Sequence, residues 1–106
     1  MSSPTQRTLI ELRKRGYPLV DVTEKWIPGA NIRRDLYGFI DVLAVSPLGK
    51  VLGVQCTSGD HVAERVDKIT NSDAIHVLRL AGWSIAVWGW RKNAKGRYVL
   101  REVELS

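Results

Sequence analysis

Two runs of the sequence decide the fold: Asp35-Leu-Tyr-Gly-Phe-Ile-Asp-Val-Leu-Ala44 and, after the turn Pro47-Leu-Gly49, Val51-Leu-Gly-Val-Gln-Cys-Thr-Ser-Gly59. The short turn predicts that the two runs pair as a hairpin. Both resemble buried strands, yet the first contains Asp41 and the second Gln55. A buried polar group costs about 2 kcal/mol or more unless it has a partner. We therefore expect Asp41 and Gln55 to lie side by side on adjacent strands, as in an oxygen-ligand site for a hard divalent cation.

Hydrophobic spacing and turn residues predict an α/β fold for the rest of the chain. Continuous apolar runs indicate central strands, and helices are expected to cover a mixed sheet. The predicted elements are a helix from Ser3 to Gly16, a strand over Leu19 to Trp26 with Val20, Val22 and Trp26 on one face, the two strands over 39–45 and 51–57, helices that start at 58–60 and at 72–73, and a final strand pair over 84–90 and 98–105.

The composition favours one domain with an anionic partner. The chain has 106 residues, of which 44% are hydrophobic, and this length suits a single domain, 1–106, with a modest core. A formal net charge of +5 favours an anionic partner. Lys and Arg gather at Arg7 to Arg15, at Arg33-Arg34 and at Arg91 to Arg101. The single cysteine, Cys56, and the lack of a signal peptide or long apolar segment predict a cytoplasmic protein that does not bind membranes.

The segment Gly38-Phe-Ile-Asp41 resembles the aspartate strand of the PD-(D/E)XK nuclease superfamily, and Gly53-Val-Gln-Cys-Thr57 lies where that superfamily has its (D/E)-X-K tripeptide. The superfamily includes archaeal Holliday junction resolvases and phage nucleases. Its restriction-endonuclease-like fold has an αβββαβ core in which helices flank a mixed central sheet. The predicted element order matches this core over nearly the whole chain, so the resemblance implies the same α/β fold here.

The resemblance also implies a metal site. Cleavage of a phosphodiester bond needs Mg²⁺ or Mn²⁺ to polarise the phosphate and to lower the pKa of an attacking water. By resemblance, Asp41 is the anionic ligand and the main-chain carbonyl of Cys56 is a neutral one. Gln55 can coordinate through its side-chain oxygen, without charge. Glu11 on the first helix matches the superfamily's helix carboxylate, and Glu24 competes for the same role.

Two positions depart from the superfamily motif. Gln55 replaces an acid, and Thr57 replaces a lysine that orients the nucleophile; a hydroxyl can bind a water but has no positive charge. A basic residue from elsewhere in the chain can substitute for this lysine, and Lys50, Arg34 and Lys68 are the candidates. The expected catalytic set is therefore Glu11, Asp41, Gln55 and Thr57. The cations expected to contact DNA are Arg33, Arg34, Lys50, Arg65 and Lys68.

Two classes of function remain open at this point. The first is a metal-dependent endonuclease, with branched DNA among its candidate substrates because the resemblance extends to resolvases. The second is a weakly active or inactive nuclease-like DNA-binding protein of a phage or mobile element. A protein-interaction module is a third alternative, and it predicts no DNA binding. Resolvase-like relatives act as dimers, which makes a homodimer an open alternative for this chain.

Overall fold

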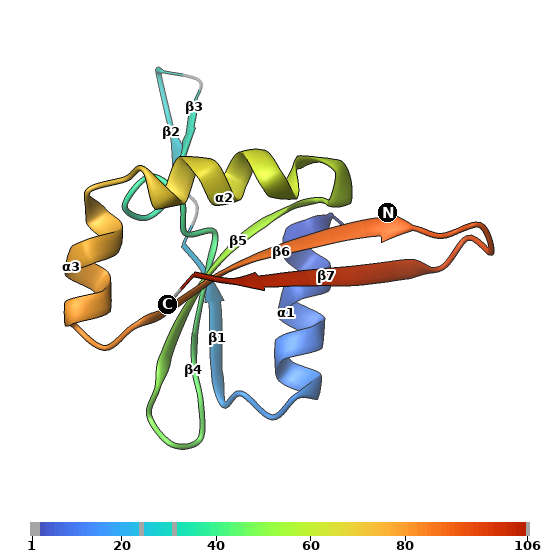
Figure 1. Cartoon of the computed structure of the whole chain (residues 1–106), viewed down its shortest axis with the longest axis horizontal. Coiled ribbons are helices and arrows are strands. Elements are labelled where there is room, and N and C mark those ends of the chain that lie inside the picture. Colours follow the sequence, from blue (N-terminus) through green and yellow to red (C-terminus); the bar gives the residue numbers. More distant parts are fainter. Residues whose placement is uncertain (1–2, 24, 31, 106) are drawn as a thin grey trace.

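The computed structural model describes residues 3–23, 25–30 and 32–105, and it gives no side-chain description for 32 and 33. Within these residues the chain forms an α/β fold with a five-stranded mixed sheet and a separate two-stranded hairpin (Figure 1). The elements are α1 (Pro4–Lys14), β1 (Leu19–Val22), β2 (Lys25–Ile27), β3 (Ile32–Arg34), β4 (Val42–Val45), β5 (Val51–Ser58), a 3₁₀ turn η1 (Gly59–His61), α2 (Val62–Thr70), α3 (Ala74–Leu80), β6 (Ser84–Lys92) and β7 (Tyr98–Glu104).

Strand β5 is the centre of the sheet, whose order is β1-β4-β5-β6-β7. It pairs antiparallel with β4, Val42 opposite Val54, and parallel with β6, Gln55 opposite Val87. The predicted hairpin between β4 and β5 is confirmed. Its turn closes through Ser46 and Lys50, with the Lys50 carbonyl accepting from the Ser46 N–H at 2.9 Å. Both runs that decide the fold thus lie inside the sheet.

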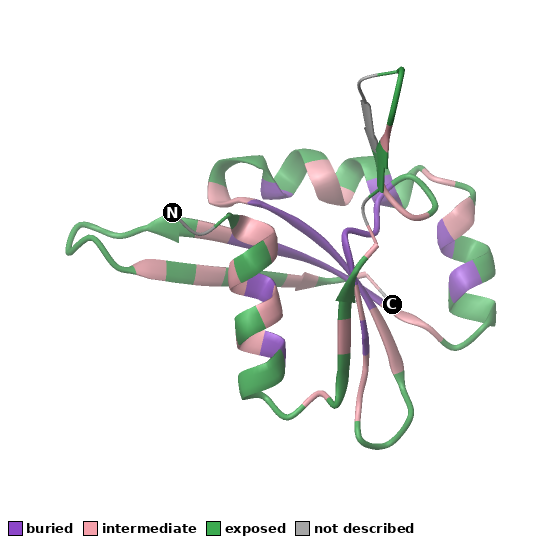
Figure 2. Cartoon of the chain, turned by 180° about the vertical axis from the view of Figure 1, so that it is seen from behind, coloured by how far each residue is buried: buried purple, intermediate pink, exposed green. Residues whose placement is uncertain are grey.

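Helices cover both faces of this sheet, as the sequence predicts. The buried cluster on the α1 face contains Leu12, Val42, Ala44, Val54, Cys56, Ala86 and Trp88. The cluster on the α2 and α3 face contains Phe39, Ile40, Val62, Ile69, Ile75, Leu78, Ile85 and Val87. Figure 2 shows the buried residues concentrated on the central strands, between these helices. Successive residues of β4 and β5 alternate between the two clusters, and this alternation fixes the face on which each polar side chain lies.

The strand predicted over Leu19 to Trp26 is wrong in its second half. Strand β1 ends at Val22, and Lys25 to Ile27 instead pairs with β3 in the separate hairpin. Thr23 ends the pairing with the sheet: its N–H donates to the Asp41 carbonyl at 2.8 Å, and its hydroxyl donates to the Ile40 carbonyl. Trp26 consequently lies outside the sheet and is 55% exposed. The β2–β3 hairpin projects from the body of the molecule (Figure 1).

No helix in the described part of the chain is long and apolar enough to cross a membrane.

Gly89 on β6 provides a test of the packing between the sheet and α2. A Cβ at this position would lie 2.2 Å from Cγ2 of Val62. We expect Gly89→Ala to lower the free energy of unfolding by about 1–3 kcal/mol, because overpacking forces the α2 start away from the sheet. Urea unfolding measures this loss. Gly53→Ala, where the added Cβ meets the flexible end of Ile40 at 2.8 Å, should cost less. Equal losses in both variants would contradict the close contact at Gly89.

Candidate functional site

Asp41 and Gln55 form a buried polar pair at one end of the sheet. Gln55 Nε2 donates to Asp41 Oδ2 at 2.7 Å, and the Cys56 N–H donates to the same oxygen at 2.8 Å. Asp41 is 5% exposed and Gln55 is 3% exposed. Asp41 lies one residue before β4, opposite Gln55 in the register of the hairpin. The expectation that these two side chains lie side by side is confirmed.

The pair leaves one polar atom without a partner. Gln55 Oε1 is buried and accepts no hydrogen bond. Its orientation is fixed, because the Nε2 atom of the same amide is bonded to Asp41. An unsatisfied buried acceptor costs about 1–3 kcal/mol, and groups of this kind are uncommon in native proteins unless a ligand completes them. Gln55 Oε1 is therefore available to accept a hydrogen bond or to bind a cation.

A second carboxylate, Asp35, joins the pair through a tight turn. Leu36 and Ile40 form an antiparallel bridge, with hydrogen bonds of 3.0 and 2.9 Å between their main chains. The next pair outward in this register is Asp35 and Asp41, whose side chains are expected about 5 Å apart at Cβ. The turn requires positive φ at Tyr37 (55°) and Gly38 (85°). It shortens β4, which starts at Val42 rather than at the predicted Phe39.

The electrostatics of Asp41 follow from this placement. Burial, and then the neighbouring Asp35 carboxyl, raise the pKa of Asp41 to about 7. The hydrogen bonds from Cys56 and Gln55 act in the opposite direction. A buried carboxylate beside another carboxylate is unfavourable in the ionised form, and a cation between them would remove that cost.

The pair opens into a pocket of about 600 Å³ between α1, the sheet and α2. Arg65 of α2 contributes the positive charge of the pocket, and its Nε is buried without a hydrogen-bond partner. The first turn of α1 contributes Gln6. The described residues that line the pocket are Ser3, Pro4, Thr5, Gln6, Val22, Asp35, Asp41, Gln55, Cys56 and Arg65.

Glu11 does not reach this pocket. It lines a separate surface hollow with Arg7, Ile10, Lys14 and Trp90. A helix turns about 100° per residue, so Glu11 lies about 140° around α1 from Gln6, which does line the pocket. Glu11 therefore lies on a different face of α1 from the residues that line the pocket.

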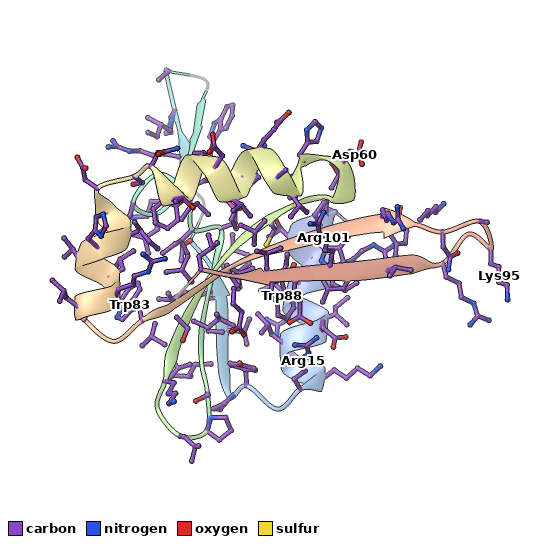
Figure 3. All side chains as sticks on the ribbon, in the orientation of Figure 1. Arg15, Asp60, Trp83, Trp88, Lys95 and Arg101 are labelled. Carbon is purple, nitrogen blue, oxygen red and sulfur yellow. The ribbon has the colours of Figure 1, made fainter. Side chains whose placement is uncertain are left out.

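Glu11 instead supports Arg15. Arg15 Nε donates to Glu11 Oε2 at 2.8 Å, and its two terminal nitrogens donate to the carboxylate of Glu102 on β7 at 2.8 and 2.9 Å. The guanidinium also lies over the Trp88 ring at 4.7 Å (Figure 3). The hydrogen bonds to Glu102 and then to Glu11 raise the pKa of Arg15, and the bond to Arg15 lowers the pKa of Glu102. They fasten the end of α1 to the sheet, which is a structural role.

The remaining motif residues are placed as follows. Thr57 is buried on β5, on the same face as Gln55, but it does not line the pocket. Cys56 lines the pocket and contributes its N–H to Asp41; the role of its carbonyl stays a prediction from the resemblance. Glu24 lies outside the described residues.

The predicted DNA-contacting cations are divided over the surface. Arg65 lines the pocket, and Arg34 lines a neighbouring hollow that shares Asp35 with the pocket. Lys68 is exposed on α2. Lys50 is in the β4–β5 turn, five residues from Gln55 and about 16 Å along the strand, so it lies at the other end of the sheet. For Arg33 only the main chain is described.

Sequence reasoning missed Asp35 and Gln6. The signal for Asp35 is the near-symmetric Asp-Leu-Tyr-Gly-Phe-Ile-Asp around Gly38, which is typical of a tight turn with one acid at each end. Within the described residues, no three His, Cys, Asp or Glu side chains converge as a metal site. Among the described residues, the carboxylates that a cation here would have are Asp35 and Asp41, and the other oxygens are neutral.

Comparison of the chain with models of protein families, with curated proteins and with solved structures found no match.

The raised pKa of Asp41 predicts a pH-dependent stability. Unfolded Asp41 loses its proton near pH 4 and folded Asp41 near pH 7, so the free energy of unfolding should fall as the pH rises between these values. Asp41→Asn removes the charge and should raise the melting temperature at pH 8 by roughly 4 °C, after allowance for solvent screening, with little gain at pH 4. Differential scanning calorimetry measures both. The exposed Asp73→Asn is the control, and an equal gain from it would contradict the burial argument.

Proposed function

We propose that the protein is a metal-dependent DNA endonuclease with a restriction-endonuclease-like core. The observation that carries this proposal is the unpartnered Gln55 Oε1, held beside Asp41 and Asp35 at the floor of an open pocket. The order helix, strand, hairpin, helix around these residues agrees with the superfamily's core. The extra β2–β3 hairpin is an insertion between its first two core strands.

The residues present fit Mg²⁺ or Mn²⁺. Asp35 and Asp41 supply negative charge, and Gln55 Oε1 supplies a neutral oxygen, which are the donor types that hard divalent cations take. The Cys56 carbonyl is the further ligand that the resemblance implies. When bound, the cation polarises the phosphate and activates a water. The chain's own contribution is to hold these oxygens in place, through the two hydrogen bonds on Asp41 Oδ2.

Arg65 is our candidate for the charge that the motif lysine supplies elsewhere. It is the cation that lines the pocket, whereas Thr57 is neutral and does not line it. A guanidinium stays protonated at all working pH values, so Arg65 would bind a phosphate and stabilise developing negative charge without exchanging a proton. Its unpartnered Nε–H is available to donate to a phosphate oxygen. Proton acceptance then falls to the carboxylates.

A non-catalytic DNA-binding protein is the second candidate function. The observation in its favour is that Gln55 and Thr57 are both neutral at positions where the superfamily has charges. Both candidates predict DNA binding that weakens steeply with salt. Metal-dependent cleavage is expected only from the first.

Cleavage should be slow and should be faster with Mn²⁺ than with Mg²⁺, because few anions hold the cation and Mn²⁺ binds such oxygen sets more tightly.

Asp41→Ala should abolish product and leave DNA affinity within about 3-fold. Gln55→Glu with Thr57→Lys should raise the rate if the pocket is a nuclease site. A gel assay over linear, flapped and four-way DNA substrates measures each rate. If the restored variant folds, binds DNA and stays inert with both metals, the binding function is the correct one.

Substitution of Asp35 and of Glu11 should affect Mn²⁺ binding differently. Asp35→Asn should weaken Mn²⁺ binding about 10-fold or more by calorimetry and lower cleavage accordingly, because it removes one of two carboxylates. Glu11→Gln should leave Mn²⁺ binding unchanged and reduce only thermal stability, through its contact with Arg15. Equal Mn²⁺ affinity in wild type and Asp35→Asn would remove Asp35 from the site.

A further inference from the structure

The β6–β7 hairpin extends past the rest of the sheet. The last pair between β5 and β6 is Ser58 with Trp90, and beyond it residues 91–99 pair only with each other. We call this segment, 91–99, the β6–β7 ribbon. It is the long arm in Figure 1, and Figure 2 shows that its tip is exposed. From Trp90 to Lys95 it reaches about 16 Å, at about 3.3 Å per residue.

The ribbon and its base, residues 91–101, contain basic residues and no acidic residue. Between 91 and 101 the sequence has Arg91, Lys92, Lys95, Arg97 and Arg101 and no acidic residue. All five are exposed. None takes part in the ion pairs found among the described residues. Lys95 stands at the tip and points away from the body of the molecule (Figure 3). Such a concentration of one charge favours a polyanion as partner.

The ribbon is held in one conformation by its turn. Asn93 Oδ1 accepts from the main-chain N–H of Lys95 at 2.9 Å and of Arg97 at 3.0 Å. Asn93 N–H donates to the Arg97 carbonyl at 2.8 Å, and Gly96 supplies the positive φ of 77°. Cations on an ordered arm lose less entropy on binding than cations on a mobile loop.

The base of the ribbon is fastened to the same helix turn that lines the pocket. Gln6 lines the pocket; the next residue, Arg7, places its guanidinium 3.3 Å from the Tyr98 ring centroid. Thr8 Oγ1 then accepts from Trp90 Nε1 at 3.0 Å. The ribbon therefore leaves the body beside the candidate site.

The ribbon also shares a face of the sheet with the polar pair. Gln55 is opposite Val87 in the parallel register, and Gly89 and Arg91 follow on the same face by alternation. Arg101 is opposite Gly89 and lies on that face as well. Cations on this face point to the side on which Asp41 and Gln55 lie.

We propose that the β6–β7 ribbon enters the major groove of duplex DNA beside the site, with Lys95, Arg97 and Arg101 on the flanking phosphates. This inference rests on the proposed DNA partner but not on catalysis. A two-stranded ribbon fits the B-form major groove, which is about 12 Å wide. The major groove of A-form RNA is too narrow for it. Phosphate contacts of this kind give affinity without sequence preference.

The test is a charge-removal pair. Lys95→Gln/Arg97→Gln/Arg101→Gln removes three cations of the ribbon and its base; Arg13→Gln/Lys50→Gln/Arg79→Gln removes three exposed cations away from the ribbon. Binding to duplex DNA is measured by fluorescence anisotropy in EDTA over a range of salt. The ribbon variant should lose about 10-fold or more in affinity, and the slope of log K against log salt should fall by about 2–3. The control should change far less, and duplex RNA should bind more weakly than DNA.

Each outcome of these binding measurements supports or overturns the ribbon proposal. Lys95→Arg/Arg97→Lys/Arg101→Lys keeps the charges and should restore affinity, which separates lost charge from lost folding. Unchanged affinity in the ribbon variant, an equal loss in the control or no DNA binding at all would overturn the ribbon proposal. DNA binding that depends on the ribbon, without cleavage in Mn²⁺, would keep this inference and reject the nuclease.

Discussion

The hydrogen bond from Gln55 Nε2 to Asp41 Oδ2 is the constraint on which this end of the molecule depends. A carboxylate that is 5% exposed needs compensation, and here the Gln55 amide and the Cys56 N–H provide it on one oxygen. The bond also fixes the register of β4 and β5. A slip of one residue would move Asp41 to the α1 face and bring Val42 out of its core cluster. The apolar pattern and the polar pair therefore specify the same alignment.

The neutral amide of Gln55 gives the site less negative charge than a glutamate at the same position would give it. A glutamate there would place a third carboxylate beside Asp35 and Asp41 and would offer no donor to Asp41 Oδ2. Gln55 donates with one end and leaves Oε1 free at the other. The site thus keeps three oxygen-bearing side chains with two negative charges. In the proposed metal site, this composition lowers the repulsion between the side chains without a cation and would also hold the cation less tightly, which is a compromise between stability and affinity.

Elements with a strong local signal were predictable from the sequence. The cap and apolar spacing of α1, the hairpin of β4 and β5, and the pair β6 and β7 all follow from residue periodicity and turn chemistry. Three features were not. The first is the end of β1: the alternation of Leu19 to Trp26 continues past Val22, and a strand pattern does not show that the two halves pair with different strands. Asp35 reaches Asp41 only through the positive φ of Tyr37. Glu11 was assigned by residue type, whereas the phase of α1 places Gln6 at the pocket.

Under the proposed function, the distribution of charge allows one small chain to combine an anionic pocket with a polyanionic partner. Asp35 and Asp41 repel a phosphate, so under the proposed function most of the affinity for DNA comes from cations placed outside the pocket. The ribbon supplies such cations on a rigid arm, and Arg34 lies on the other flank, in the hollow that shares Asp35 with the pocket. Arg65 is the cation within the pocket, where it partly offsets the two carboxylates. The proposed DNA binding and the proposed chemistry then depend on different residues, which allows the two to be separated by substitution.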